Sequence, residues 1–521
     1  MMRSLAALLI QFSFASGLKF LLYNPDNPGA SKSHVILVDK LGDLLVNAGH
    51  EVVTYMPYVN EVSFANFTRK SDLLLYKVSM DVPKFAQNTN IWLRDFEVTE
   101  IAAWMKQLGD VATRSCKIQL EDEALMQRLR DENFDFGLVE YFDPCGVGIF
   151  HKIGLKRYSM VYSTQIHLTH ARYVGIPTPT SFVPENTWTS ASKMTFMQRV
   201  WNFLANVIVE PYVISSHISG FNEIFNPMGK TVYDLMAEGG YIFINTDEFV
   251  DFPKPISHKV VNIGGIGMKK LLSIPQRLPA EYQKVFDTAK KGVVLISFGS
   301  LARTVDIPMK SRKALFEAFR HFPEINFVVK YEDKDHKPLE LPSNVFLAEW
   351  LPQPAILANN KTLAFVTHGG QNSVTESTYA GVPLIVVPLF GDQFRNAESV
   401  KERGVAEILR KQDLSSKQKI VDVFRKVIYN DDYQNTANEL AKVMLAKPMS
   451  ADERFVRHCE FGAQFDIHHY LDLQGRHLNF IQYNNLDVIA FLIAFTVLTL
   501  YVLYRRAVFI LTFRVDKAKE E

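Results

Sequence analysis

The residues with the clearest chemical potential lie in the C-terminal half, where a short apolar run ends in Thr-His-Gly-Gly at residues 367–370. Two glycines permit a tight turn, and the sequence predicts a helix that opens near Asn372 and Ser373. The first amides of a helix lack partners and its dipole favours negative charge, so these residues and His368 suit a pyrophosphate. A structural interpretation competes, because Ser373 and Glu376 also have the spacing of a capping box.

Side chains that follow other apolar runs of the same half suit the remaining parts of a nucleotide sugar. The indole of Trp350 offers a flat surface for a base. Residues 297–300 form a second glycine turn at a strand end, where Ser300 and nearby amides could reach the same anion. The carboxylate of Glu376 and the Asp392-Gln393 pair could bind hydroxyl groups of a ribose and a sugar. The combination predicts a nucleotide-sugar site.

The N-terminal half offers a candidate general base. His34 follows the first predicted strand and its loop and stands at the start of a helix, which places it at the edge of the first sheet. The near-neutral pKa of histidine suits removal of a hydroxyl proton, and a carboxylate on the other ring nitrogen strengthens such a base. Glu140 and Asp143 are the two candidates for that carboxylate. A lone histidine more often binds locally or faces solvent, so the residue type alone does not decide its role.

Short apolar runs that alternate with helical patterns must position these residues. This rhythm is typical of parallel α/β folds, in which the carboxyl ends of the strands share one edge of the sheet. Helices are expected over residues 34–48 and 313–321, among others. The predicted strands include residues 19–23, 51–55, 136–139, 293–297, 326–330, 344–347, 364–367 and 384–387.

The length of 521 residues exceeds what one core holds, and prolines and glycines concentrate at residues 252–279. We therefore predict an α/β fold of two Rossmann-like domains, an N-terminal domain over 18–275 that binds the acceptor and a C-terminal domain over 276–450 that binds the nucleotide sugar. A return segment over 451–487 follows them. Open α/β sheets bind ligands beyond their strand carboxyl ends, so the site is expected in the cleft between the domains.

An apolar stripe at helical spacing over residues 196–208 admits three interpretations. We favour a helix that faces the core. A lid over an apolar acceptor, or a surface that touches a membrane, would use the same stripe.

The two ends of the chain predict a membrane protein. Residues 1–17 combine a basic start, an apolar run and small residues, which is the layout of a cleaved signal peptide. Residues 488–504 are apolar and uncharged and predict one transmembrane helix, and the basic residues of 505–521 place that tail in the cytosol. The body would then be lumenal, where sequons at Asn66 and Asn360 could carry glycans.

Charge, cysteine content and motifs argue against several other functions. The chain has 57 Lys and Arg against 56 Asp and Glu, so its net charge of +1 gives no overall field for nucleic acid. Cys116, Cys145 and Cys459 are too few for a disulfide framework or a thiolate zinc site. No Gly-x-Gly-x-x-Gly follows the first strand, which disfavours an NAD-dependent oxidoreductase. Asp333 and Asp335 have the spacing of the cation site of a metal-dependent glycosyltransferase, but nothing nearby adds ligands.

The block from Trp350 to Asn396 resembles the signature of the UDP-glucuronosyltransferase family, within the wider UDP-glycosyltransferases. The resemblance extends over nearly the whole chain and is closest in look to an invertebrate member. It implies the two-domain GT-B fold and a single-pass type I protein of the endoplasmic reticulum membrane, with lumenal domains and a role in detoxification. Lys517 and Lys519 are similar to a dilysine retrieval signal.

The resemblance also implies roles for matching residues of the C-terminal half. Trp350 would stack on uracil, Gln353 would contact the uracil–ribose end and Glu376 would bind ribose hydroxyls. Asp392 and Gln393 would bind the hydroxyls of the sugar. The diphosphate would be held by Ser300, His368, Asn372 and Ser373.

In the N-terminal half the resemblance implies that His34 is the catalytic base. Counting back from Pro144, the aspartate position of the family is occupied by Glu140, which we favour over Asp143. The implied reaction is an inverting single displacement without a metal or another cofactor.

The donor and the acceptor stay open at this stage. Glucuronate transfer is expected to need a cation from the interdomain segment, and residues 252–259 offer lysines and a histidine but no arginine. UDP-glucuronate is therefore the family default and UDP-glucose its competitor, with a small lipophilic alcohol, phenol or acid as acceptor. A membrane-anchored nucleotide-sugar-binding protein without catalysis is the alternative, which His34, Glu140 and Asp392 argue against. The sequence does not indicate an oligomeric state.

Overall fold

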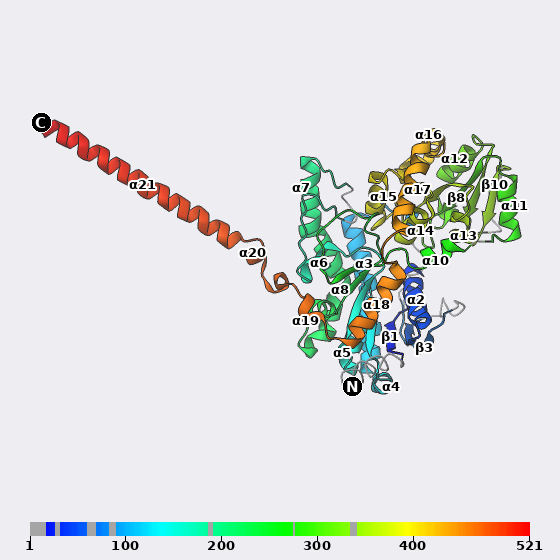
Figure 1. The fold of residues 1–521 in the computed structure, drawn as a ribbon, viewed down its shortest axis with the longest axis horizontal. Coiled ribbons are helices and arrows are strands. Elements are labelled where there is room, and N and C mark those ends of the chain that lie inside the picture. Colours follow the sequence, from blue (N-terminus) through cyan, green and yellow to red (C-terminus); the bar gives the residue numbers. More distant parts are fainter. Residues whose placement is uncertain are drawn as a thin grey trace, which may run out of the picture.

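The computed structural model describes residues 17–26, 32–59, 69–82, 90–185, 191–274, 277–333 and 341–520, with the backbone alone over 513–520. The predicted signal peptide, apart from its last residue, the sequon at Asn66 and the second aspartate of the Asp333–Asp335 pair lie outside these ranges. Two parallel sheets with helices packed on them form the body, and one long helix leads away from it (Figure 1). The predicted α/β class with two domains and a C-terminal apolar helix is confirmed.

The first sheet has seven strands in the order β3-β2-β1-β4-β5-β6-β7, and every neighbouring pair is parallel. The order reverses between β1 and β4, and such a switch point opens a crevice beyond the strand carboxyl ends. The strands are β1 (Lys19–Tyr23), β2 (Glu51–Tyr58), β3 (Asp72–Lys77), β4 (Phe136–Glu140), β5 (Tyr158–Tyr162), β6 (Ile242–Ile244) and β7 (Val260–Asn262).

Both faces of this sheet are covered, which explains why its strands are continuous apolar runs. Leu21 and Tyr23 of β1 belong to one buried cluster, and Phe20 and Leu22 belong to another on the opposite face. The helices of this half are α2 (Lys32–Asn47), α3 (Val98–Glu121), α4 (Glu123–Asp131), α5 (Cys145–Ile153), α6 (Leu168–Tyr173), α7 (Phe196–Leu204), α8 (Glu210–Phe225) and α9 (Val232–Ala237).

The second sheet has six parallel strands in the order β10-β9-β8-β11-β12-β13. Its strands are β8 (Gly292–Ser297), β9 (Ile325–Lys330), β10 (Val345–Ala348), β11 (Thr362–Thr367), β12 (Leu384–Val386) and β13 (Ala406–Ile408). Its helices are α10 (Met268–Ser273), α11 (Ala280–Thr288), α12 (Met309–Phe319), α13 (Gln353–Leu357), α14 (Gln371–Ala380), α15 (Gln393–Glu402), α16 (Lys417–Ile428) and α17 (Asp431–Leu445).

The chain returns to the first domain after α17. Phe455 and Cys459 of α18 (Ala451–Gln464) join the buried cluster that contains Phe20, so this helix covers the first sheet. Two short helices, α19 (His468–Leu471) and α20 (Phe480–Tyr483), lead to α21 (Leu486–Glu520), which extends away from the body (Figure 1). The stretch Leu486–Thr512 has a mean hydropathy of 2.4 and no buried residue, so it is long and apolar enough to cross a membrane.

The apolar stripe of α7 lies on the surface, so the prediction of a core-facing helix is wrong. Phe196, Met197 and Trp201 are each more than half exposed, and Asn202 is the one buried residue of α7. The side-chain amide of Asn202 donates hydrogen bonds to the carbonyls of Thr180 and Val183, so this polar group has partners where it is buried. The helix therefore packs on the body through hydrogen bonds and leaves its apolar face open.

Cys116 of α3 and Cys145 of α5 form a disulfide, with Cα atoms 5.4 Å apart. The sequence analysis did not predict this bridge, because a count of three cysteines does not show which helices come together. Cys459 is buried and free.

Candidate active site

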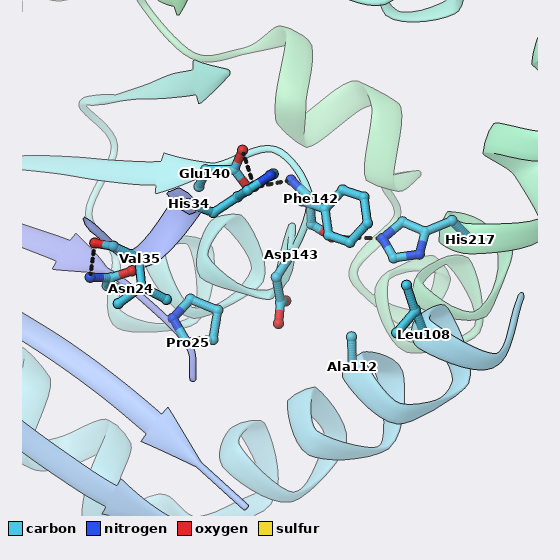
Figure 2. A pocket seen from close by; sticks show the side chains of 10 residues that line it. All are labelled: Asn24, Pro25, His34, Val35, Leu108, Ala112, Glu140, Phe142, Asp143 and His217. Atoms are coloured by element: carbon cyan, nitrogen blue, oxygen red, sulfur yellow. Dashed lines mark hydrogen bonds and ion pairs between the residues drawn. The ribbon is translucent and has the colours of Figure 1, made fainter. Parts of the chain in front are cut away.

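Three cavities meet at His34, near the start of α2. One lies within the first domain and contains Glu140 and Asp143 (Figure 2). The second, called the polar cavity here, has a volume of about 190 Å³ and lies between the domains. The third, called the apolar cavity, has a volume of about 180 Å³. His34 is thus the residue at which a ligand of the second domain would meet a ligand of the first.

His34 and Glu140 form a pair at the carboxyl edge of the first sheet. His34 Nδ1 lies 3.1 Å from Glu140 Oε1, and Figure 2 shows the two side chains directed toward each other. Glu140 ends β4 and is buried, and its carboxylate accepts hydrogen bonds from the amides of Phe142 (2.9 Å) and Ser163 (3.3 Å). The carboxylate is therefore fixed by the backbone, and it leaves His34 Nε2 as the nitrogen for a substrate.

The environment of His34 favours its protonated form. Burial lowers the pKa of His34, but the Glu140 carboxylate and Asp392 raise it by more, so the pKa lies above its ordinary value of 6.5. A base with a raised pKa binds a proton more strongly, and the adjacent carboxylate stabilises the imidazolium that results.

Asp143 has a different position. Its Oδ1 accepts a hydrogen bond from the amide of Cys145 at 3.1 Å, at the start of α5, and Figure 2 shows its carboxylate directed away from His34. This is the arrangement of a residue that fixes the turn before a proline. The structure pairs His34 with Glu140, whereas Asp143 is bound to the turn before α5.

The N-terminus of α14 faces the polar cavity. The helix begins at Gln371, and Gly370 precedes it without a side-chain cap. Glu376 does not reach back to the start of the helix, since its Oε2 accepts a hydrogen bond from Gln353 Nε2 at 2.7 Å. The capping-box interpretation is therefore wrong, and the first amides of α14 are available to an anion.

His368 follows β11 and packs tightly between two glycines. A Cβ atom at Gly299 would lie 2.8 Å from His368 Cε1, and one at Gly370 would lie 2.5 Å from His368 Nε2. Gly299 also has φ +82°, a conformation that other residues rarely adopt. Burial and the nearby Lys330 lower the pKa of His368 to about 4, so at neutral pH its ring is an uncharged hydrogen-bonding group.

Two residues at the start of α15 also line the polar cavity. Asp392 Oδ2 accepts a hydrogen bond from Asn396 at 2.8 Å. Burial raises the pKa of Asp392, against the lowering effects of Asn396, His167 and His34. Gln393 Oε1 accepts hydrogen bonds from the amides of Leu389 and Phe390, which fix the orientation of the side chain.

Some of the residues predicted to bind the UDP-sugar line the polar cavity, and the others lie outside it. Trp350 lies outside the wall of the polar cavity and is 67% exposed, with Lys330 Nζ 5.7 Å from its ring centroid. Glu376 shares a smaller cavity with Asn372 and Lys40, and burial raises its pKa. Gln353 is the hydrogen-bond partner of Glu376. The structure brings to the polar cavity Ser300, His368, Asn372, Ser373, Asp392 and Gln393.

The structure adds polar residues that the sequence analysis missed. Ser163 and Thr164 follow β5 and line the polar cavity, and Asn245 follows β6 and donates to Asn372 Oδ1 at 2.8 Å. The same signal, a polar residue after a short apolar run, would have found all three. Asn245 connects the first domain directly to the start of α14.

The apolar cavity is bounded mainly by the first domain. Most of its wall is aromatic or aliphatic, with residues of α3 and α8 among it and with Phe390 and Leu301 added by the second domain. Its volume and composition suit a small lipophilic molecule. The lining from α3 and α8 consists of Ile101, Trp104, Met105, Leu108, Glu210, Val213 and Ile214.

The two lysines of the interdomain segment have partners. Lys254 Nζ donates to Gln165 Oε1 at 2.6 Å and lies 3.0 Å from Asp251 Oδ2. Lys259 Nζ lies 2.6 Å from Asp472. Among the described residues that line the polar cavity, none is a lysine or an arginine.

Comparisons with known proteins agree over most of the chain. The profile of the family described as "UDP-glucoronosyl and UDP-glucosyl transferase" matches residues 28–521. The chain is 32% identical over 500 residues to "Putative UDP-glucuronosyltransferase ugt-48" of Caenorhabditis elegans, with 90% of this chain and 91% of that one covered. It is 27% identical over 517 residues to UDP-glucuronosyltransferase 1A10 of Homo sapiens, with 96% and 92% covered. A solved UDP-glucosyltransferase from Polygonum tinctorium has the same fold, with a TM-score of 0.60 at 15% identity over 87% of this chain and 100% of that one.

Proposed function

The chain belongs to the family of UDP-glucuronosyl and UDP-glucosyl transferases, and from this premise we propose that it transfers the hexose of a UDP-sugar to a hydroxyl group of a small lipophilic acceptor. The observation that carries the proposal is the position of His34. Its ring lines the polar cavity on the side of the second domain and the apolar cavity of the first. A donor in one cavity and an acceptor in the other would therefore meet at this base.

In the proposed reaction His34 Nε2 takes the proton of the acceptor hydroxyl while the acceptor oxygen attacks the anomeric carbon. The bond from that carbon to the UDP oxygen breaks, and UDP leaves from the opposite face, so the configuration inverts. Glu140 holds Nδ1 and stabilises the imidazolium. Asp143 has a structural role in this scheme, because it is bound to the turn before α5.

The second domain would stabilise the charge that develops on UDP. The uncapped start of α14 offers amides to the diphosphate, together with Ser300, Asn372 and Ser373. Neutral His368 would add a hydrogen bond. Trp350 offers an exposed ring face to uracil. The Gln353–Glu376 pair would bind the uracil–ribose end, and Asp392 with Gln393 would bind the sugar.

For the donor we propose UDP-glucose ahead of UDP-glucuronate. A glucuronate carboxylate needs a cation, and Lys254 is engaged by Asp251 and Gln165. To bind the carboxylate, Lys254 would have to leave the buried Asp251, which also pairs with Arg395. The ratio of kcat/KM for the two donors tests this choice, and a ratio in favour of UDP-glucuronate would reverse it.

We propose a lumenal body anchored by α21 in the endoplasmic reticulum membrane. The stretch Leu486–Thr512 can span a bilayer, and the disulfide Cys116–Cys145 fits an oxidising compartment. Activity in sealed microsomes should rise when detergent admits the UDP-sugar. Equal activity in sealed and opened microsomes would place the domains in the cytosol instead.

The proposed function is tested with microsomes that contain the full chain, both UDP-sugars and a panel of phenols. We expect a glycoside with at least one donor, and we expect the rate to persist in a chelator, since the scheme uses neither a metal nor another cofactor. Absence of transfer from both donors to every acceptor would overturn the proposal. Loss of activity in chelator would show that a cation takes part.

The pH dependence of transfer reports on the His34–Glu140 pair. The base must be neutral to act, so kcat/KM for the acceptor should fall as the pH drops through a pKa above 6.5. In Glu140→Gln the raising effect of the carboxylate is gone while burial still lowers the pKa, so the inflection should move to lower pH. An inflection at the same pH in wild type and Glu140→Gln would show that the pair does not control the base.

A further inference from the structure

A second cluster of polar side chains lies on the wall of the apolar cavity and has no part in the transfer described above. It consists of Tyr141, which follows β4, His167, which precedes α6, and Glu210, the first residue of α8. Most other side chains of this wall are aromatic or aliphatic. The cluster is therefore a polar point on a surface that otherwise suits an apolar ligand.

The three side chains contact one another in a line, through one ion-pair contact and one hydrogen bond. Glu210 Oε1 lies 3.5 Å from His167 Nδ1, and His167 Nε2 lies 2.7 Å from the Tyr141 hydroxyl. A carboxylate that faces Nδ1 favours the proton of the neutral ring on that nitrogen. Nε2 is then an acceptor, and the Tyr141 hydroxyl donates to it. The remaining capacity of the Tyr141 oxygen is that of an acceptor.

Tyr141 is held in place and keeps its proton. Its ring stacks on Tyr162 with centroids 4.4 Å apart and planes 7° from parallel. Burial raises the pKa of Tyr141 well above 10, the nearby Glu140 and Asp392 add to this effect, and a hydrogen bond with the side chain of Thr164 opposes it. The direction of the hydrogen bond from Tyr141 to His167 is therefore stable.

Glu210 supplies further acceptor capacity. Its residue is only 3% exposed, and its Oε1 is close to His167 and to the amide of Thr169 (3.4 Å). Its Oε2 is buried and has no hydrogen-bond partner among the described residues. A buried carboxylate oxygen without a donor is unfavourable, so a donor group in the cavity would stabilise it.

We propose that the cluster of Tyr141, His167 and Glu210 binds a second hydrogen-bond donor of the acceptor, a hydroxyl or a protonated amine. This rests on the proposed function: one hydroxyl is glycosylated at His34 while the other group binds the cluster. Preferred acceptors are then aromatic or alicyclic compounds with two such groups. An acceptor with a single hydroxyl leaves Glu210 Oε2 without a hydrogen-bond donor.

The test compares naphthol, the isomers of dihydroxynaphthalene and their monomethyl ethers as acceptors. In wild type, kcat/KM for at least one dihydroxy isomer should exceed that of its methyl ether by roughly 10- to 100-fold, the effect of leaving a buried polar group without a partner. In Glu210→Leu, which removes the unpaired oxygen, this ratio should fall to near one, and in Tyr141→Phe, which leaves Glu210 in place, it should fall less. Tyr162→Phe is the matched control, because Tyr162 stacks on Tyr141 without lining the cavity, and it should keep the ratio.

The outcomes separate this inference from the proposed function. Transfer to naphthol with a ratio near one for every isomer would overturn the inference and leave the transfer reaction intact. A ratio that survives in Glu210→Leu would overturn it as well. If no acceptor is glycosylated, the proposed function fails, and the affinity of the full chain for the same compounds, measured by fluorescence, still decides whether the cluster prefers the dihydroxy isomer.

Discussion

Replacement of His34 by alanine is expected to lower kcat for glycoside formation by roughly 10²–10⁴-fold, the usual contribution of a general base. The acceptor hydroxyl would lose the group that takes its proton, while the polar cavity and the start of α14 would still bind the donor. The KM for the UDP-sugar should therefore change much less than kcat. Steady-state kinetics with detergent-solubilised full chain provide both parameters.

A control variant and a stability measurement show whether the loss of activity in His34→Ala is specific to catalysis. His321→Ala removes an exposed histidine of the second domain and should keep the wild-type rate. Thermal denaturation of His34→Ala near the wild-type temperature would show that the loss is chemical. A variant that folds and retains the full kcat would mean that another group takes the proton, and the assignment of His34 would be wrong.

Replacement of Glu376 by alanine is expected to weaken the binding of UDP by roughly 10- to 100-fold, because hydrogen bonds to a charged carboxylate are among the stronger ones. Glu376 accepts a hydrogen bond from Gln353 at 2.7 Å, so the variant would lose both the proposed ribose contact and the partner that orients Gln353. Inhibition by UDP and the KM for the UDP-sugar measure the effect. The kcat at saturating donor should fall far less than in His34→Ala.

Replacement by glutamine separates the contribution of the Glu376 charge to UDP binding from that of its hydrogen bond. Glu376→Gln keeps an oxygen that can accept from Gln353 and should fall between wild type and Glu376→Ala. Glu439→Ala removes an exposed glutamate of α17 in the same domain and should bind UDP as wild type does. Unchanged UDP inhibition in Glu376→Ala would move the ribose site elsewhere in the second domain.

The sequence predicted the strands well because their signal is local. A strand covered on both faces is a continuous apolar run, and each of the eight predicted strands is present with bounds that differ by three residues or fewer. Residues placed directly after a strand, such as His368 after β11, could also be positioned, since parallel strands share one carboxyl edge. Several residues of the polar cavity were therefore predictable from the sequence alone.

The predictions that were wrong or missing concern contacts between residues that are distant in the chain. The spacing of Ser373 and Glu376 fits a capping box. In the structure, however, the Glu376 carboxylate accepts a hydrogen bond from Gln353 of another helix. The stripe of α7 has the spacing of a buried face, but whether a face is covered depends on elements far away in the chain. Cys116 and Cys145 became partners only when α3 and α5 packed together.

The sequence by itself determined the α/β class, the two-domain plan, the apolar C-terminal helix and the residues at the strand ends. Each of these follows from a pattern within a few residues. The tertiary structure alone decided that Glu140 lies against His34, and that Tyr141, His167 and Glu210 contact one another on the wall of the apolar cavity. Such contacts depend on strand order and helix packing, which bring distant residues to within about 3 Å, and no local pattern encodes that distance.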